Sequence, residues 1–175
     1  KMTIEWLAGN RIRGTSTERT TTTGFNPVDA VVGGWKEVGR TTLGSSGSII
    51  TVASLPDKRY YMILGDHSSA GTSIRLNNDT GTSYSARFNA NGAGEATDVS
   101  RSSGGFITDS RTNPHFNVTY LANLSTKEKL WQNQNVYNIT TGAATAPLRE
   151  EAVGKWSNTS NAVDEFAYLA WAGSY

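Results

Sequence analysis

Between residues 115 and 124 the chain alternates between apolar and polar side chains. The apolar positions are Phe116, Val118, Tyr120 and Ala122. Asn117 and Thr119 are among the residues that occupy the other side of the alternation. A period of two residues is typical of a β-strand that buries one face and exposes the other to water. The pattern therefore predicts a strand whose Phe116 face lies in the core and whose Asn117 face lies in solvent or against a neighbouring chain.

Short stretches that are rich in apolar and β-branched residues recur from residue 35 onward, and segments rich in Gly, Ser, Asn, Asp and Pro separate them. We expect strands at 36–42, 48–54, 59–64, 73–76, 84–89, 106–108, 115–124, 129–137, 155–158 and 162–170. The last of these also fits the apolar face of a helix, but its Trp, Tyr and Phe neighbours favour a strand. Many short strands at this spacing predict a sandwich or a barrel.

The segments between the strands differ in character. Residues 1–34 hold a short apolar stretch near residues 4–7 and then an almost wholly polar run, which predicts an N-terminal arm and linker ahead of a β-domain at 35–175. Residues 100–114 and 138–154 predict long surface loops, the second with room for one helical turn at 148–152.

Composition narrows the class of protein. The 175 residues are 37% hydrophobic and include 17 aromatic side chains (five Trp, seven Tyr and five Phe), so the chain can bury a real core. A net charge of +1 does not supply the basic surface that nucleic acid requires. The chain has no cysteine, so it has neither a disulfide nor a thiolate metal site. No apolar run is long enough for membrane insertion.

The stretch RLNNDTGTSYSARF, residues 75–88, predicts a hairpin with a polar tip. A calcium loop needs alternating oxygen donors and a distal bidentate Glu, whereas this tip offers one carboxylate, Asp79. We therefore expect no metal, and interpret the tip as an Asx-type turn in which Gly81 takes a positive φ.

No catalytic or cofactor motif stands out. His67 lies beside Asp66 and several serines, but a Ser–His–Asp triad is defined by geometry, and no nucleophile-elbow motif supports one. His115 falls at a strand entry, and the acidic residues are adequately explained as solvated charges. The glycine-bearing turns lack the spacing of a phosphate loop. We expect a protein that is not an enzyme and has no cofactor.

The strand at 129–137 combines aromatic and amide side chains. Trp131, Tyr137, Asn133 and Asn135 form a candidate contact surface for a glycan or a protein partner, because exposed aromatic rings stack on sugars and amides bond their hydroxyls. The same alternation also permits Trp131 to face the core while the amides face water.

Four segments, 4–20, 33–64, 75–100 and 146–166, resemble structural proteins of tailed-phage virions. The resemblance extends from about Trp6 to Phe166, and its two recurring patterns lie within residues 75–87 and 149–156. It implies a β-sandwich module of a head fibre, a decoration protein or a tail appendage.

These observations together predict an antiparallel β-sandwich, jelly-roll-like, with an extended N-terminal arm. We expect a virion structural protein, assembled as a trimer with copies of itself and with other virion proteins. The alternative is a carbohydrate-binding or host-receptor-binding adhesin module that contacts a host surface glycan.

Overall fold

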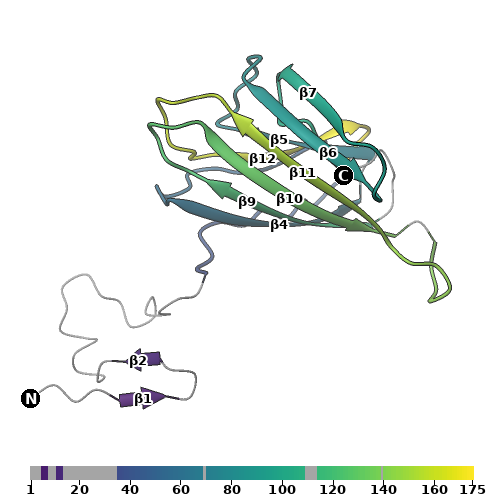
Figure 1. Ribbon diagram of the computed structural model, residues 1–175, viewed down its shortest axis with the longest axis horizontal. Helices are drawn as coiled ribbons and strands as arrows, with labels where there is room; N and C mark the ends of the chain where they lie inside the picture. Colours follow the sequence, from purple (N-terminus) through teal and green to yellow (C-terminus); the bar gives the residue numbers. More distant parts are fainter. Residues whose placement is uncertain (1–4, 8–10, 14–34, 69, 109–113, 139) are drawn as a thin grey trace, which may run out of the picture. The chain divides into compact units, whose positions relative to one another are not determined.

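The computed structural model describes residues 5–7, 11–13, 35–68, 70–108, 114–138 and 140–175 (Figure 1). The chain divides into two compact units, Lys1–Glu37 and Val38–Tyr175, close to the boundary expected after residue 34. In the first unit, β1 (Glu5–Leu7) pairs antiparallel with β2 (Arg11–Arg13). The apolar stretch near residues 4–7 thus contains the strand β1, and β2 was not predicted; the polar run at 14–34 lies outside the described residues.

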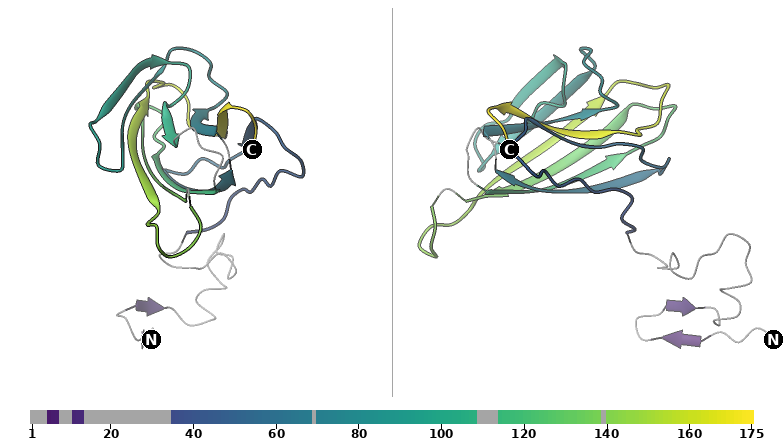
Figure 2. Two further views of the ribbon diagram at one scale, coloured as in Figure 1. Left: turned by 90° about the vertical axis from the view of Figure 1, so that its right-hand side faces the viewer. Right: turned by 180° about the vertical axis from the view of Figure 1, so that it is seen from behind.

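The second unit is built of two antiparallel sheets. The larger sheet has the strand order β4 (Tyr60–Ser68), β9 (Pro114–Ala122), β10 (Lys129–Tyr137), β11 (Leu148–Trp156), β6 (Tyr84–Ala90) and β7 (Ala96–Arg101). The smaller sheet has the order β3 (Ile49–Val52), β12 (Phe166–Ala172), β5 (Ala70–Leu76) and β8 (Phe106–Thr108). Figure 2 shows the larger sheet curving around the smaller one.

The strand order has the logic of a jelly roll. If the meander β9–β10–β11 is counted as one position, eight positions remain in the second unit. Counted in this way along the chain, positions 1, 8, 3 and 6 form the smaller sheet, and positions 2, 7, 4 and 5 form the larger sheet. This is the strand order of a jelly roll, which consists of two Greek keys. The predicted antiparallel, jelly-roll-like β-sandwich is thus confirmed. The larger sheet has two additional strands, because β9, β10 and β11 stand where a jelly roll has one strand.

The strand predictions need correction at four places. Residues 36–42, expected as a strand, form none, and β7 is a strand that was not predicted. β4 was expected to end at Leu64 but continues to Ser68. The segment 148–156, expected to be mostly loop with a helical turn, is the long strand β11. Its inward positions include Ala152 and Gly154, which are too small to give a hydrophobic alternation.

The segment 75–88 is not a hairpin. β5 and β6 lie in different sheets, so the residues between them form an arch from one sheet to the other. Asn77 and Asn78 both adopt left-handed backbone conformations, with φ of 50° and 51°, and Gly81 does not have the positive φ that we expected of it. The Asx turn itself is present, because the amide of Gly81 donates to Asp79 Oδ1 at 2.7 Å.

The alternation along β9 is real, but its direction is opposite to the prediction. His115, Asn117 and Thr119 are buried between the sheets, while Phe116 is 46% exposed. Asn135 on β10 lies opposite Asn117, and it is buried on the same inner face. The polar side of the pattern therefore forms part of the interior, and the apolar side covers the outer face of the larger sheet.

The apolar core lies beside this polar interior. Its largest fully buried side chain is that of Trp156, whose ring stacks on Tyr84 with centroids 6.3 Å apart. Trp131, which is 3% exposed, packs in the same cluster against the backbone of Gly154. The aromatic rings thus fill the space that the small inward residues of β11 leave open.

Gly154 gives a test of this packing. A Cβ atom there would lie 2.8 Å from the backbone oxygen of Ser85 and would overlap the Trp131 ring. We expect Gly154→Ala to lower the free energy of unfolding by roughly 1–3 kcal/mol, the usual cost of overpacking. Gly94→Ala is the control, since nothing lies within 4 Å of its added Cβ. Denaturant melts in which the two variants lose equal stability would refute this account.

Candidate functional site

Six polar side chains gather on the inner face of the larger sheet. They come from three neighbouring strands and are His67, His115, Asn117, Thr119, Asn133 and Asn135. We call this set the inner polar cluster. Strand register explains why they meet, because His67 lies opposite His115 across β4 and β9, and Asn117 and Thr119 lie opposite Asn135 and Asn133 across β9 and β10.

Hydrogen bonds join the members of the inner polar cluster. Asn117 Nδ2 lies 2.8 Å from His67 Nε2, and Asn133 Nδ2 donates to Thr119 Oγ1 at 2.8 Å. Asn135 Nδ2 donates to Glu150 Oε2 at 3.0 Å and lies 3.3 Å from His115 Nδ1. These bonds offset much of the cost of removing polar groups from water.

Aromatic rings enclose the cluster from both sheets. The rings of His67 and His115 stack with centroids 5.6 Å apart, and His115 stacks in turn on Tyr137 at 4.9 Å. From the smaller sheet, Tyr168 approaches His67 at 5.7 Å, and the C-terminal Tyr175 approaches it edge-on at 4.9 Å. The cluster is therefore an interlayer feature and not part of the outer surface.

Several acceptors in the cluster have no hydrogen-bond partner among the described residues. They are the side-chain oxygens of Asn117, Asn133 and Asn135. His67 Nδ1 also has no partner, but it is the N–H donor of the neutral ring, because Nε2 accepts from Asn117 Nδ2. A buried acceptor without a donor costs about 1–3 kcal/mol, so the three amide oxygens favour any group that brings O–H or N–H donors into the interlayer space.

Burial keeps His67 and the neighbouring Tyr168 uncharged at neutral pH. Desolvation, assisted by the nearby His115, lowers the pKa of His67 to about 4. Desolvation raises the pKa of Tyr168 to about 12, although its contact with Thr119 acts in the opposite direction. At pH 7 these two side chains are therefore uncharged and act only as hydrogen-bonding groups.

All four sequence-predicted contact residues lie together on the inner face of β10. Trp131, Tyr137, Asn133 and Asn135 are each nearly fully buried, and the exposed residues of that strand include Gln132 and Gln134. Because Trp131 is buried, its ring offers no exposed face on which a sugar could stack. The sequence did not indicate the partners His67, His115 and Asn117, which meet because β4, β9 and β10 are neighbours with their polar residues turned inward.

The arch at residues 75–88 has a structural role. Asp79 Oδ2 accepts a hydrogen bond from Trp156 Nε1 at 2.6 Å, and its Oδ1 accepts the one from Gly81. Burial alone would raise the pKa of the Asp79 carboxyl, but hydrogen bonds from Trp156, Gly81 and Ser83 outweigh it and hold the pKa below its usual value. Both carboxylate oxygens are therefore engaged by the protein's own donors.

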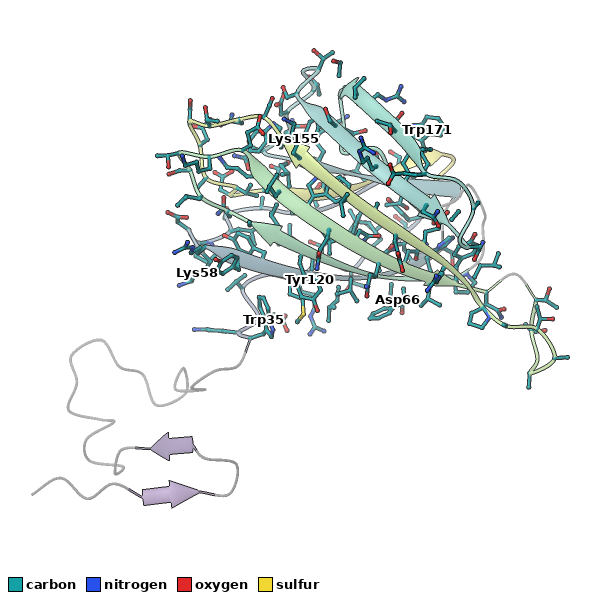
Figure 3. The ribbon with its side chains drawn as sticks, viewed as in Figure 1. Trp35, Lys58, Asp66, Tyr120, Lys155 and Trp171 are labelled. Carbon is teal, nitrogen blue, oxygen red and sulfur yellow. The ribbon has the colours of Figure 1, made fainter. Side chains whose placement is uncertain are left out.

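The outer face of β4 and β9 carries a second candidate site, which we call the outer apolar patch. It consists of Tyr60, Met62 and Leu64 from β4 and Phe116, Val118 and Tyr120 from β9. Leu64 is 59% exposed and lies opposite Val118, and Met62 lies opposite Tyr120. Figure 3 shows the Tyr120 side chain on this face.

The comparisons with known proteins add no assignment: no family model, curated protein or solved structure matches the chain. Among the described residues, no group of three or more His, Asp or Glu side chains is arranged to hold a metal ion. The part of the chain that the structure describes also includes no helix with the length and apolarity to cross a bilayer.

His67 makes the stability of the fold depend on pH. Above pH 6.5 it is neutral in both the folded and the unfolded chain, whereas between pH 6.5 and about 4 only the unfolded chain takes up the proton. We expect the free energy of unfolding to fall by roughly 3 kcal/mol as the pH falls through this window.

The test compares His67→Gln with the wild-type chain in denaturant melts from pH 7 to pH 4. The substitution removes the His67 share of the acid loss, while Ser68→Ala, at the next exposed position of β4, leaves it in place. Equal pH slopes for His67→Gln and the wild type would show that the buried imidazole is not responsible.

Proposed function

We propose that the chain is a non-enzymatic structural subunit that assembles with copies of itself. The observation that carries the proposal is the outer apolar patch. Contiguous exposed apolar surfaces often mark interaction sites. The patch also includes residues of β4, an edge strand of the larger sheet, and exposed edge strands invite pairing with another chain.

The kind of assembly that we propose is based on a resemblance in the sequence. The segments 33–64, 75–100 and 146–166 resemble structural proteins of tailed-phage virions. We therefore propose a virion subunit of the decoration, fibre or appendage type, with other virion proteins as further partners. The uncharged His67 and the doubly bonded Asp79 are in keeping with a building block.

The full chain should form a homo-oligomer at micromolar concentration, because burying the outer apolar patch removes its side chains from water. Mass photometry with light scattering after size exclusion measures the mass directly. An antiserum against the purified chain should also label phage particles by immunogold microscopy. A monodisperse monomer would overturn the assembly proposal, and unlabelled particles would overturn the virion assignment.

A glycan-binding role is the second candidate, favoured by the unpartnered oxygens of Asn117, Asn133 and Asn135. Sugar hydroxyls would supply the donors that these oxygens lack, provided that the ligand reaches the space between the sheets. A glycan array should then show binding that Asn133→Ala abolishes and that Gln132→Ala, the exposed neighbour, retains. An array without any bound glycan would rule this role out.

A further inference from the structure

We infer that β4 pairs antiparallel with β4 of a second copy, with the two-fold axis passing at Met62, so that the two larger sheets become one continuous sheet. The inference deepens the proposed assembly function and rests on it. It specifies the strand, the register and the symmetry of the contact.

The free side of β4 supplies the main-chain hydrogen-bonding groups. β4 is the last strand of the larger sheet and has nine residues, all paired on one side with β9 from Tyr60 opposite Ala122 to Ser68 opposite Pro114. On its other side no strand pairs with it in the part of the chain that the structure describes. A long edge of this kind is a template for another strand.

Geometry restricts the registers in which β4 can meet itself. Residues directly opposite in an antiparallel pair point to the same face, so the outward residues Tyr60, Met62 and Leu64 must face outward residues of the partner. With the axis at Met62, Tyr60 lies opposite Leu64 of the partner subunit, and Met62 lies opposite its own counterpart. The outer apolar patches of the two copies then join into one surface across the shared sheet.

The neighbouring registers fit less well. An axis at Ile63 places the aromatic Tyr60 opposite Asp66 of the partner subunit. An axis at Leu64 places Met62 opposite that same carboxylate. Either arrangement sets a charge against an apolar side chain, as does an axis at Tyr61, which places Lys58 opposite Leu64 of the partner subunit. The sequence of β4 therefore favours the axis at Met62.

Charge complementarity supports the same register. The axis at Met62 brings Lys58 opposite Asp66 of the partner subunit, and symmetry forms this pair twice. Both side chains are exposed, and Figure 3 shows them near opposite ends of β4. Neither forms an ion pair with another residue of the described chain. Such a contact is isologous and closes as a dimer, rather than the trimer expected from the sequence.

A cysteine scan tests the register, since the chain has no cysteine of its own. In Met62→Cys the two sulfurs meet at the axis, and mild oxidation should convert most of the chain into a covalent dimer. In Leu64→Cys the two positions lie four residues apart along the paired strands, about 13 Å at roughly 3.3 Å per residue. That separation is too large for a disulfide, so Leu64→Cys should stay uncoupled.

Val153→Cys is the control for random collision, because Val153 is exposed on the same sheet face but lies on β11. Coupling of Leu64→Cys in preference to Met62→Cys would overturn the register. Equal coupling of all three variants would overturn the contact.

A charge exchange tests the same contact without cysteine. Asp66→Lys and Lys58→Asp each place like charges opposite one another twice and should raise the dimer dissociation constant about tenfold or more. The double variant restores both pairs and should return the constant to near its wild-type value. Failure of the double variant to recover would overturn the inference.

The outcomes separate this inference from the proposed function. If the wild-type chain is oligomeric and none of these substitutions changes its mass or dissociation constant, β4 is not the interface, while assembly itself stands. A wild-type trimer would likewise overturn the β4 contact and leave assembly standing. A wild-type monomer overturns both. Circular dichroism and thermal unfolding confirm that each variant is folded before its mass is interpreted.

Discussion

Pairing of polar groups inside the sandwich is the constraint on which the rest of this structure depends. β9 and β10 present amides and an imidazole to the interior, where each buried polar group costs free energy unless it finds a hydrogen-bond partner. The antiparallel register sets Asn133 opposite Thr119, to which it donates, while Asn117 and Asn135 find partners on neighbouring strands in His67 and Glu150. Tyr168 of the smaller sheet completes the set from the opposite layer. The apolar residues of β9 are consequently left on the outside.

Side-chain amides also fix the connections at the ends of the sheets. Asn77 donates to the carbonyl oxygen of Ala162 and accepts from the amides of Asp164 and Glu165. Asn123 accepts from the amide of Val163 at 2.7 Å. The buried ammonium of Lys129 is held by three backbone carbonyls, those of Ser125, Lys127 and Asn158. The contacts of Asn77 and Asn123, and that of Lys129 with Asn158, join segments that are distant in sequence and so determine where the loops can run.

The sequence predicts strands well where alternation involves large side chains. β10 and β8 begin and end at the residues expected, and the four candidate contact residues of β10 share one face as their parity requires. Alternation does not reveal which face is inward, and for β9 the prediction was wrong because its inward polar groups are satisfied by neighbours that are distant in sequence. β11 escaped detection since Ala152 and Gly154 make room for Trp131, which is a property of the partner strand. The arch at Asn77 resembles a hairpin in sequence, because turn residues specify a bend and not the sheet that the next strand joins.

The side-chain amides of Asn77 and Asn123, which hydrogen-bond to the backbone of residues 162–165, determine how the fold responds to redox conditions. They hold segments about as far apart in sequence as a disulfide in a small secreted domain would, yet they consist only of hydrogen bonds between amide and backbone groups. Thiol reagents, glutathione and oxygen do not act on such bonds. These hydrogen bonds therefore form in a reducing cell interior and persist in an oxidising medium. The fold needs no oxidation step to mature.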